Sequence, residues 1–243
     1  MNSGNQPFDS KSVEEALIHQ VSIFGLTTRL VWCITPGLSD VPVNFITKTL
    51  RSLVVRQILE AHPLHHGRFY FSLTKKAVKE LATENTSGGP FNERDKLRSY
   101  ARLLLSTMHI RGTTPVPRTK LLKSLGESAI GLPDHFMFHQ LERKLYLVRV
   151  DAAIHAFPSR MAQQLRTVVY RSVKLPVLCE LIRQKRFEIV LVTCTVRRKE
   201  AILKHFRSYD RVGSTPIRSI VIPELLPLIT SVPFGGVIHP NTT

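Results

Sequence analysis

The chain has 243 residues, an apolar fraction of 43% and a formal net charge of +16, from 34 Lys and Arg against 18 Asp and Glu. The apolar fraction excludes an intrinsically disordered chain, and the length suits one large domain or two small ones. No apolar run is long enough to span a bilayer and the N-terminus lacks the layout of a signal peptide, so we expect a cytoplasmic protein without membrane contact.

The N-terminal part of the chain predicts helices around one short strand. Apolar positions recur at helical spacing over residues 12–25, where Ser12 and Glu15 form an S-x-x-E capping box. The elements expected after it are an amphipathic helix over 43–61, a turn at HHGR, a strand over 68–73 and a helix over 74–82. This order is typical of a winged helix-turn-helix domain, which we place at residues 1–84.

The polar face of the helix over residues 43–61 carries candidate DNA-contacting side chains. They are Asn44, Thr47, Lys48, Arg51 and Arg56. Arg and Asn suit base edges, whereas Lys and Thr suit phosphates. Two further donors, Arg68 in the turn and Lys75 at the start of the next helix, are expected to contact phosphate. The alternative interpretation is an ordinary solvated helix face.

The rest of the chain predicts an α/β domain. Segment 85–92 is rich in Gly, Pro and small polar residues and is expected to be a linker. The helices expected after it cover residues 93–110, 159–175, 177–185 and 196–209. The expected strands cover residues 132–140, 144–152, 187–195 and part of 214–226, and the stretch 111–131 is expected to be irregular. We therefore expect a mixed-sheet α/β domain over 93–230, an α+β chain overall and a loose tail over 231–243.

Charge is distributed unevenly along the chain. Residues 1–90 hold 9 basic and 7 acidic residues, a net of +2, whereas residues 91–243 hold 25 basic and 11 acidic residues, a net of +14. Such a basic region attracts polyanions, so double-stranded DNA is the expected partner. The three cysteines, Cys33, Cys179 and Cys194, have no CxxC spacing and lie in apolar runs, so we expect reduced core thiols and no structural zinc.

Several short motifs, taken in this order, resemble the replication-relaxation proteins of plasmids and other mobile elements. They are ITKTLRSLVVRQIL, RFYFSLTKKAVKEL, LPDHFMF, LYLVRVD, QLRTVVYRS and FEIVLVTCTVRRKEAILKHF, within residues 40–210. The resemblance implies an N-terminal winged helix followed by a restriction-endonuclease-like domain of the PD-(D/E)xK type.

The resemblance also locates an acid motif. Cores of this type hold Mg²⁺ with one Asp and an acid-x-acid pair on the next strand. The first acid falls on Asp134, and the pair falls on Arg149 and Asp151, with no lysine after it. A guanidinium at Arg149 would repel Mg²⁺ and pair with the acids. We therefore expect neither a cofactor nor catalysis, with two alternatives left open: a Mg²⁺-dependent nuclease using Asp134 and Asp151, and an unrelated α/β domain with an Arg–Asp salt bridge.

A second basic cluster follows the buried strand expected over residues 187–195. Arg197, Arg198 and Lys199 stand at the start of the next helix, where side chains and backbone N–H groups together suit phosphate. The alternative is helix-surface charge.

Together these features predict a non-catalytic, double-stranded DNA-binding protein of a plasmid, conjugative element or phage. It would act as a transcriptional regulator or as an accessory factor in plasmid relaxation and transfer. The C-terminal domain would add phosphate contacts, a homodimer surface or a dock for relaxosome or transcription partners. The alternatives are a metal-dependent nicking endonuclease and a protein-interaction module of a DNA-processing complex.

Overall fold

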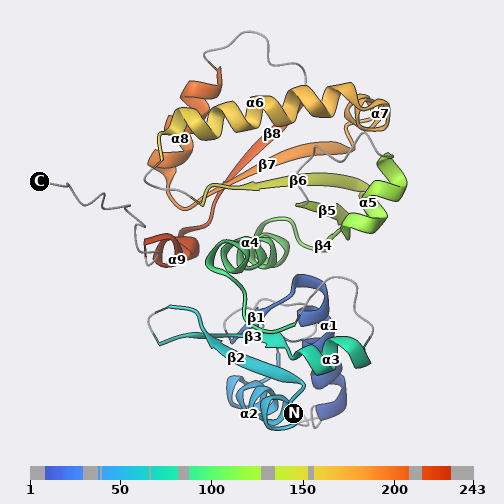
Figure 1. Ribbon diagram of the computed structural model, residues 1–243, viewed down its shortest axis with the longest axis vertical. Coiled ribbons are helices and arrows are strands. Elements are labelled where there is room, and N and C mark those ends of the chain that lie inside the picture. Colours follow the sequence, from blue (N-terminus) through green and yellow to red (C-terminus); the bar gives the residue numbers. More distant parts are fainter. Residues whose placement is uncertain are drawn as a thin grey trace, which may run out of the picture.

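The computed structural model describes residues 9–29, 38, 40–65, 67–81, 88–126, 135–152, 156–207 and 215–230. The chain is α+β, with a three-stranded sheet in its N-terminal part and a five-stranded sheet in its C-terminal part. Helix α4 (Glu93–Leu104) lies between the two sheets (Figure 1). Within the described ranges, no helix has the length and apolar character needed to cross a membrane.

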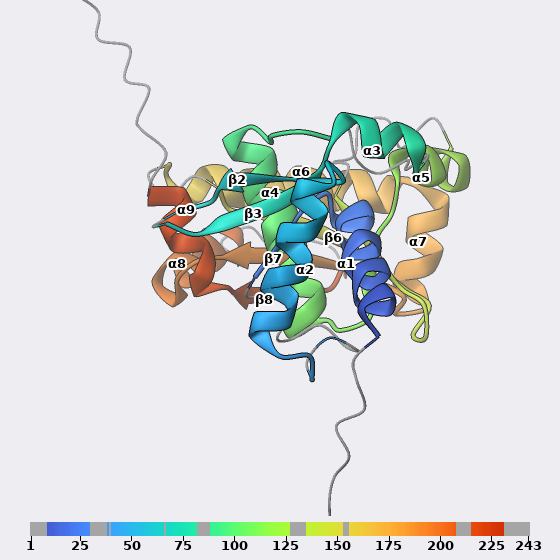
Figure 2. The same ribbon diagram turned by 90° about the horizontal axis from the view of Figure 1, so that it is seen from below.

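The N-terminal sheet is antiparallel and has β3 at its centre. The elements of this part are α1 (Ser10–Phe24), β1 (Thr27–Thr28), α2 (Val43–Val55), β2 (Leu59–Pro63), β3 (Phe69–Leu73) and α3 (Lys75–Glu80). The strand order is β1-β3-β2, and the register of the hairpin pairs Leu59 with Leu73 and Pro63 with Phe69. Helices α1 and α2 lie side by side, and the β2–β3 hairpin extends to one side of α2 (Figure 2).

Helix α1 begins earlier than its predicted capping box. The cap is Asp9, whose carboxylate accepts hydrogen bonds from the backbone N–H groups of Lys11 and Ser12. Ser12 is therefore inside the helix, and the predicted box with Glu15 was wrong. Aspartate is among the best N-cap residues, which explains why it takes this position.

Helix α2 ends at Val55, short of the predicted helix over residues 43–61. The chain turns at Gln57, which has a left-handed φ of 57°, and enters strand β2 at Leu59. The apolar spacing of α2 continues past this turn, so the sequence of residues 56–61 also has a helical pattern. The chain forms a strand there instead, because hydrogen bonds to β3 satisfy backbone N–H and C=O groups beyond the end of the helix.

The C-terminal sheet has the order β4-β5-β6-β7-β8. Its strands are β4 (Thr113–Pro115), β5 (Phe136–His139), β6 (Lys144–Val150), β7 (Phe187–Thr193) and β8 (Ile217–Val221). The helical elements after α4 are η2 (Leu105–His109), α5 (Arg118–Leu125), α6 (Pro158–Lys174), α7 (Pro176–Arg183), α8 (Val196–Arg207), η4 (Pro223–Leu225) and α9 (Leu226–Thr230). Strands β4, β5 and β6 are antiparallel neighbours, whereas β6, β7 and β8 are parallel.

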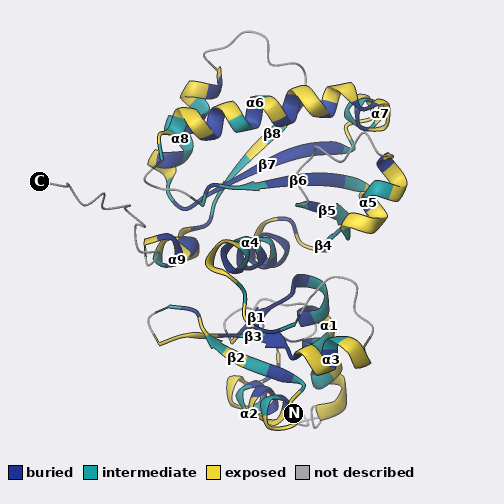
Figure 3. Cartoon of the chain, in the orientation of Figure 1, coloured by how far each residue is buried: buried dark blue, intermediate teal, exposed yellow. Residues whose placement is uncertain are grey.

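The mixed sheet confirms the predicted class, and β5 and β6, which lie within the strands expected over 132–140 and 144–152, form an antiparallel hairpin. Strand β4 and helix α5 correct the expectation that residues 111–131 are irregular. Helices α6 and α8 cover one face of the sheet, and α4 and α9 lie on the other (Figure 1). All of β7 is buried, whereas α6 is exposed along its outer face (Figure 3).

Helix α4 joins the two parts of the chain through one apolar cluster. That cluster contains Leu26 and Tyr70 from the N-terminal part, Tyr100 from α4, and Val148 and Val190 from the C-terminal sheet. The described end of the expected linker, residues 88–92, is held in place by backbone hydrogen bonds. The N–H of Gly89 donates to Leu73 O at 2.9 Å, and the N–H of Phe91 donates to the Tyr70 hydroxyl at 3.0 Å. The domain boundaries at residues 84 and 93 stay a prediction.

Gly25 is expected to be intolerant of any side chain. It ends α1 with a φ of 82°, and a Cβ built there would lie 2.7 Å from Phe91 Cζ. We expect Gly25→Ala to lower the free energy of unfolding by about 2–4 kcal/mol, through left-handed strain and overpacking. Gly67→Ala is the control, because Gly67 has a φ of 70° with nothing within 4 Å of the added Cβ. Urea unfolding of both variants tests this, and equal losses would contradict the role of the Phe91 contact.

Candidate functional site

Helix α2 presents a polar stripe to solvent. Asn44, Lys48 and Arg51 are exposed, and their spacing of four and then three residues puts them on one face of the helix. Thr47 is half-buried, and its hydroxyl donates to Val43 O at 2.9 Å, so it is already used within the helix. The accessible part of the predicted contact set on this helix is therefore the Asn44–Lys48–Arg51 stripe.

Two predicted contact residues lie away from this stripe. Arg56 Nη1 is 2.7 Å from Glu14 Oε2 of α1, so its charge is engaged in an exposed ion pair between the two helices. Lys75 is exposed at the start of α3, and its side chain lies near Gly89. Neither Arg56 nor Lys75 is part of the Asn44–Lys48–Arg51 stripe.

Three arginines from different elements meet at one cavity of about 620 Å³. They are Arg29 after β1, Arg51 of α2 and Arg68 in the hairpin turn, and none of the described lining residues is Asp or Glu. Most of the remaining lining is apolar, contributed by Leu50, Val54, Val55, Leu64, Phe69 and Phe71. A basic rim beside an exposed apolar surface suits a ligand that presents both anionic and apolar groups, as the phosphates and base edges of DNA do.

Tyr100 extends this cavity to α4. It is a lining residue, 1% exposed, and burial raises the pKa of its phenol, so it is a neutral hydrogen-bonding group at neutral pH. Tyr100 also belongs to the apolar cluster that joins both sheets, so this wall of the cavity is held in place by core packing.

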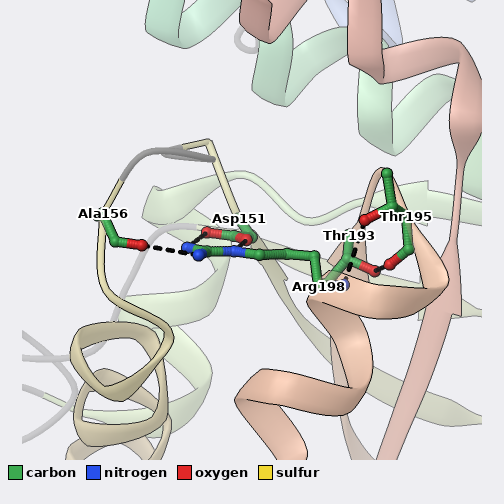
Figure 4. Close-up of polar contacts among 5 residues, drawn as sticks. All are labelled: Asp151, Ala156, Thr193, Thr195 and Arg198. Atoms are coloured by element: carbon green, nitrogen blue, oxygen red, sulfur yellow. Dashed lines mark hydrogen bonds and ion pairs between the residues drawn. The ribbon is translucent and has the colours of Figure 1, made fainter.

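Asp151, one of the two predicted acids, lies in a buried ion pair with Arg198 of α8. Its Oδ2 is 2.6 Å from Arg198 Nε and its Oδ1 is 3.2 Å from Arg198 Nη2, while Arg198 Nη1 donates to Ala156 O at 2.7 Å (Figure 4). The two side chains are 1% and 9% exposed. Thr195 Oγ1 accepts from the Arg198 N–H at 3.2 Å and so caps the start of α8. This is a bidentate pair of the strong, charge-assisted kind.

The pairing corrects two expectations from the sequence. Arg198 is not a surface group available to phosphate, because burial and Asp151 fix it in the interior. Arg149 does not form the hydrogen-bonded pair with Asp151; its Nη2 donates to Gln164 Oε1 of α6 at 2.9 Å. Of the other two residues in the predicted cluster, Arg197 is exposed and Lys199 is half-buried.

The Asp151 carboxylate is poorly suited to a metal ion in this state. Both of its oxygens already accept from a guanidinium, whose charge repels a cation at the same place. In the ranges that the structure describes, no three His, Cys, Asp or Glu side chains gather as metal ligands would. Asp134, the other predicted acid, lies outside these ranges, as do Pro133 and Cys33.

The two described cysteines are free thiols. Cys194 is 2% exposed, as predicted for a core thiol, and burial together with the Asp151 carboxylate raises its pKa. Cys179 is half-buried. Cys194 therefore lacks the depressed pKa that a nucleophile needs.

Comparison of the chain with protein-family models, with curated proteins and with solved structures found no match. The resemblance to replication-relaxation proteins therefore stays a hypothesis.

The structure also brings together arginines that sequence reasoning did not select. Arg94 and Arg98 of α4 and Arg160 of α6 lie around the same small cavity as Arg149 and Asp151. Arg94 and Arg98 have the spacing of neighbours on one helix face, which is a signal visible in the sequence. Their proximity to Arg149 depends on how α4 packs under the sheet, and no local pattern reports that.

Proposed function

We propose that this chain binds double-stranded DNA without catalysis, through a winged helix in its N-terminal part. The observation that carries the proposal is the convergence of Arg29, Arg51 and Arg68 on one cavity without an opposing acid among its described lining. The order α1, α2, β2, β3 and the sheet order β1-β3-β2 support a winged helix, with α2 as the recognition helix and the hairpin as the wing.

The C-terminal part supports the proposed nuclease-like fold without supporting its chemistry. Apart from η2, α5 and α7, the order is α4-β4-β5-β6-α6-β7, which agrees with a restriction-endonuclease-like core, in which the acids lie beside β5 and β6. Pairing of Asp151 with Arg198 removes one of those acids from metal binding. We therefore propose that this domain serves binding or assembly, as part of a transcriptional regulator or of a transfer complex of a mobile element. The mobile-element assignment rests on the motif order alone.

Arg51→Gln is expected to weaken duplex binding by about tenfold and to reduce the salt dependence of the affinity by about one unit of slope, because one phosphate contact is lost. The control is Arg207→Gln, which removes the same charge from an exposed position at the end of α8. Fluorescence anisotropy with duplex DNA from the gene's own neighbourhood, over a series of salt concentrations, measures both quantities.

Two results would contradict the proposal. One is the absence of duplex binding by the unaltered protein at moderate salt. The other is an equal effect of Arg51→Gln and Arg207→Gln, which would mean that the charge acts only as a diffuse field. An affinity independent of salt would instead favour a protein-interaction module.

A further inference from the structure

A second cavity, of about 190 Å³, opens beside the Asp151–Arg198 pair. It is bounded by α4, the end of β6 and the start of α6. Its described lining includes five arginines, namely Arg94, Arg98, Arg149, Arg160 and Arg198, against one carboxylate, Asp151. Because Arg198 matches the charge of Asp151, the other arginines leave the described lining with a net positive charge.

Two acids, Glu93 and Asp95, lie in the first turn of α4, beside Arg94. Asp95 Oδ1 is 3.4 Å from Arg98 Nη1, but the Asp95 side chain is 50% exposed and its effect is screened by solvent. Glu93, in the same turn of α4, is 2.7 Å from Lys96. Among the residues that the structure describes, no carboxylate lies within ion-pair distance of Arg94, Arg149 or Arg160.

Arg149 is a half-buried member of this lining. Its Nη2 donates to Gln164, whereas its Nε is buried and has no hydrogen-bond partner in the described structure. Burial, with the charges of Arg98 and Arg94, lowers its pKa from the usual value. A buried donor without an acceptor costs free energy that an anion in the pocket would recover.

The start of α6 faces the same cavity. Ala156, Arg160 and Met161 are lining residues, and α6 begins after Phe157 with no side-chain cap and no acid in its first turn. The positive end of the helix dipole favours an anion there. The dipole of α6 and the lining arginines are separate features, and both favour a negatively charged ligand.

We propose that this pocket binds a phosphate group, held by Arg94, Arg98, Arg149 and Arg160 at the start of α6. Planar guanidinium groups match phosphate oxygens two at a time. A cavity of about 190 Å³ admits a phosphate group but no duplex. The phosphate that fits is a monoester at the end of a nucleic-acid strand or the free anion. The pocket does not depend on duplex recognition by α2.

The test compares two variants that each remove two exposed positive charges. Arg94→Gln with Arg160→Gln changes the pocket, whereas Arg111→Gln with Lys123→Gln changes the surface elsewhere. Isothermal titration of inorganic phosphate into the full chain is expected to show binding to the unaltered protein and to the surface variant. The pocket variant is expected to lose about tenfold or more in affinity, since two charge-assisted contacts disappear.

A second arm identifies the source of the phosphate. Binding of a short single-stranded oligonucleotide is measured with a 5′-phosphate and with a 5′-hydroxyl, in the same three proteins. Tighter binding of the phosphorylated strand, lost in the pocket variant, assigns a strand end; binding of inorganic phosphate without such a preference assigns the free anion. The proposal is overturned if the unaltered protein shows neither effect, or if the pocket and surface variants behave alike. The effect of Arg51→Gln on duplex binding tests the role of α2 and not the phosphate pocket, so either proposal can be contradicted without the other.

Discussion

Asp151→Asn is expected to destabilise the protein by about 3–5 kcal/mol, because Arg198 would keep a buried charge without its counter-ion. The carboxylate is 2.6 Å from Arg198 Nε, and both side chains are at most 9% exposed. Asparagine has nearly the same shape, so the loss reports charge rather than packing. Urea unfolding measures the change in the free energy of unfolding.

An exposed ion pair provides the matched control. Glu14 and Arg56 join α1 and α2 at 2.7 Å, with side chains 23% and 51% exposed. Solvent screens such a pair, so Glu14→Gln is expected to cost about 1 kcal/mol or less. The double variant Asp151→Asn with Arg198→Met removes both buried charges and is expected to recover part of the loss. If Asp151→Asn and Glu14→Gln cost the same, the pair does not have the role assigned to it.

The same Asp151 variant separates the binding protein from the nicking endonuclease. If Asp151 held a metal ion, Asp151→Asn would abolish Mg²⁺-dependent nicking of supercoiled plasmid and would leave stability nearly unchanged. The ion pair predicts the reverse: a large loss of stability and no nicking activity to lose. Metal-dependent nicking by the unaltered protein that disappears in Asp134→Ala would overturn the non-catalytic assignment.

Local patterns predicted those parts of the fold that local interactions decide. The β5–β6 hairpin, the buried strand β7 and helices α6 and α8 follow from alternation, continuous apolar runs and helical spacing. Strand β2 was missed because its residues continue the helical spacing of α2, and only the partner strand β3 decides its conformation. Strand β4 was missed for a similar reason, since it is short and pairs with a distant segment.

The candidate site could be predicted only in part. The sequence identified Asp151 and an opposing arginine, but it offered Arg149, two residues away, rather than Arg198, which is 47 residues away. The choice depends on the crossover from β6 through α6 to β7, which brings the start of α8 beside the end of β6. Spacing along a strand reports which residues share a face, and it does not report which helix packs there.

Lowering the pH from about 8 to about 5 is expected to cost the protein about 2 kcal/mol through His135 alone. His135 lies in the arginine-lined cavity, where burial and the charges of Arg102, Arg98 and Arg149 lower its pKa from 6.5 to about 3. Between these two values the unfolded chain binds a proton that the folded chain does not. The stability contributed by neutral His135 is therefore complete above pH 6.5 and is lost as the pH falls below it, at about 1.4 kcal/mol per pH unit.

His135→Gln isolates this contribution, because glutamine does not titrate. The free energy of unfolding is measured for both proteins at about pH 8 and about pH 5, and the unaltered protein is expected to lose about 2 kcal/mol more than the variant. Burial also lowers the pKa of His62, but His62 is present in both proteins and its contribution cancels. An identical pH dependence in the two proteins would mean that burial and the arginine charges do not hold His135 neutral.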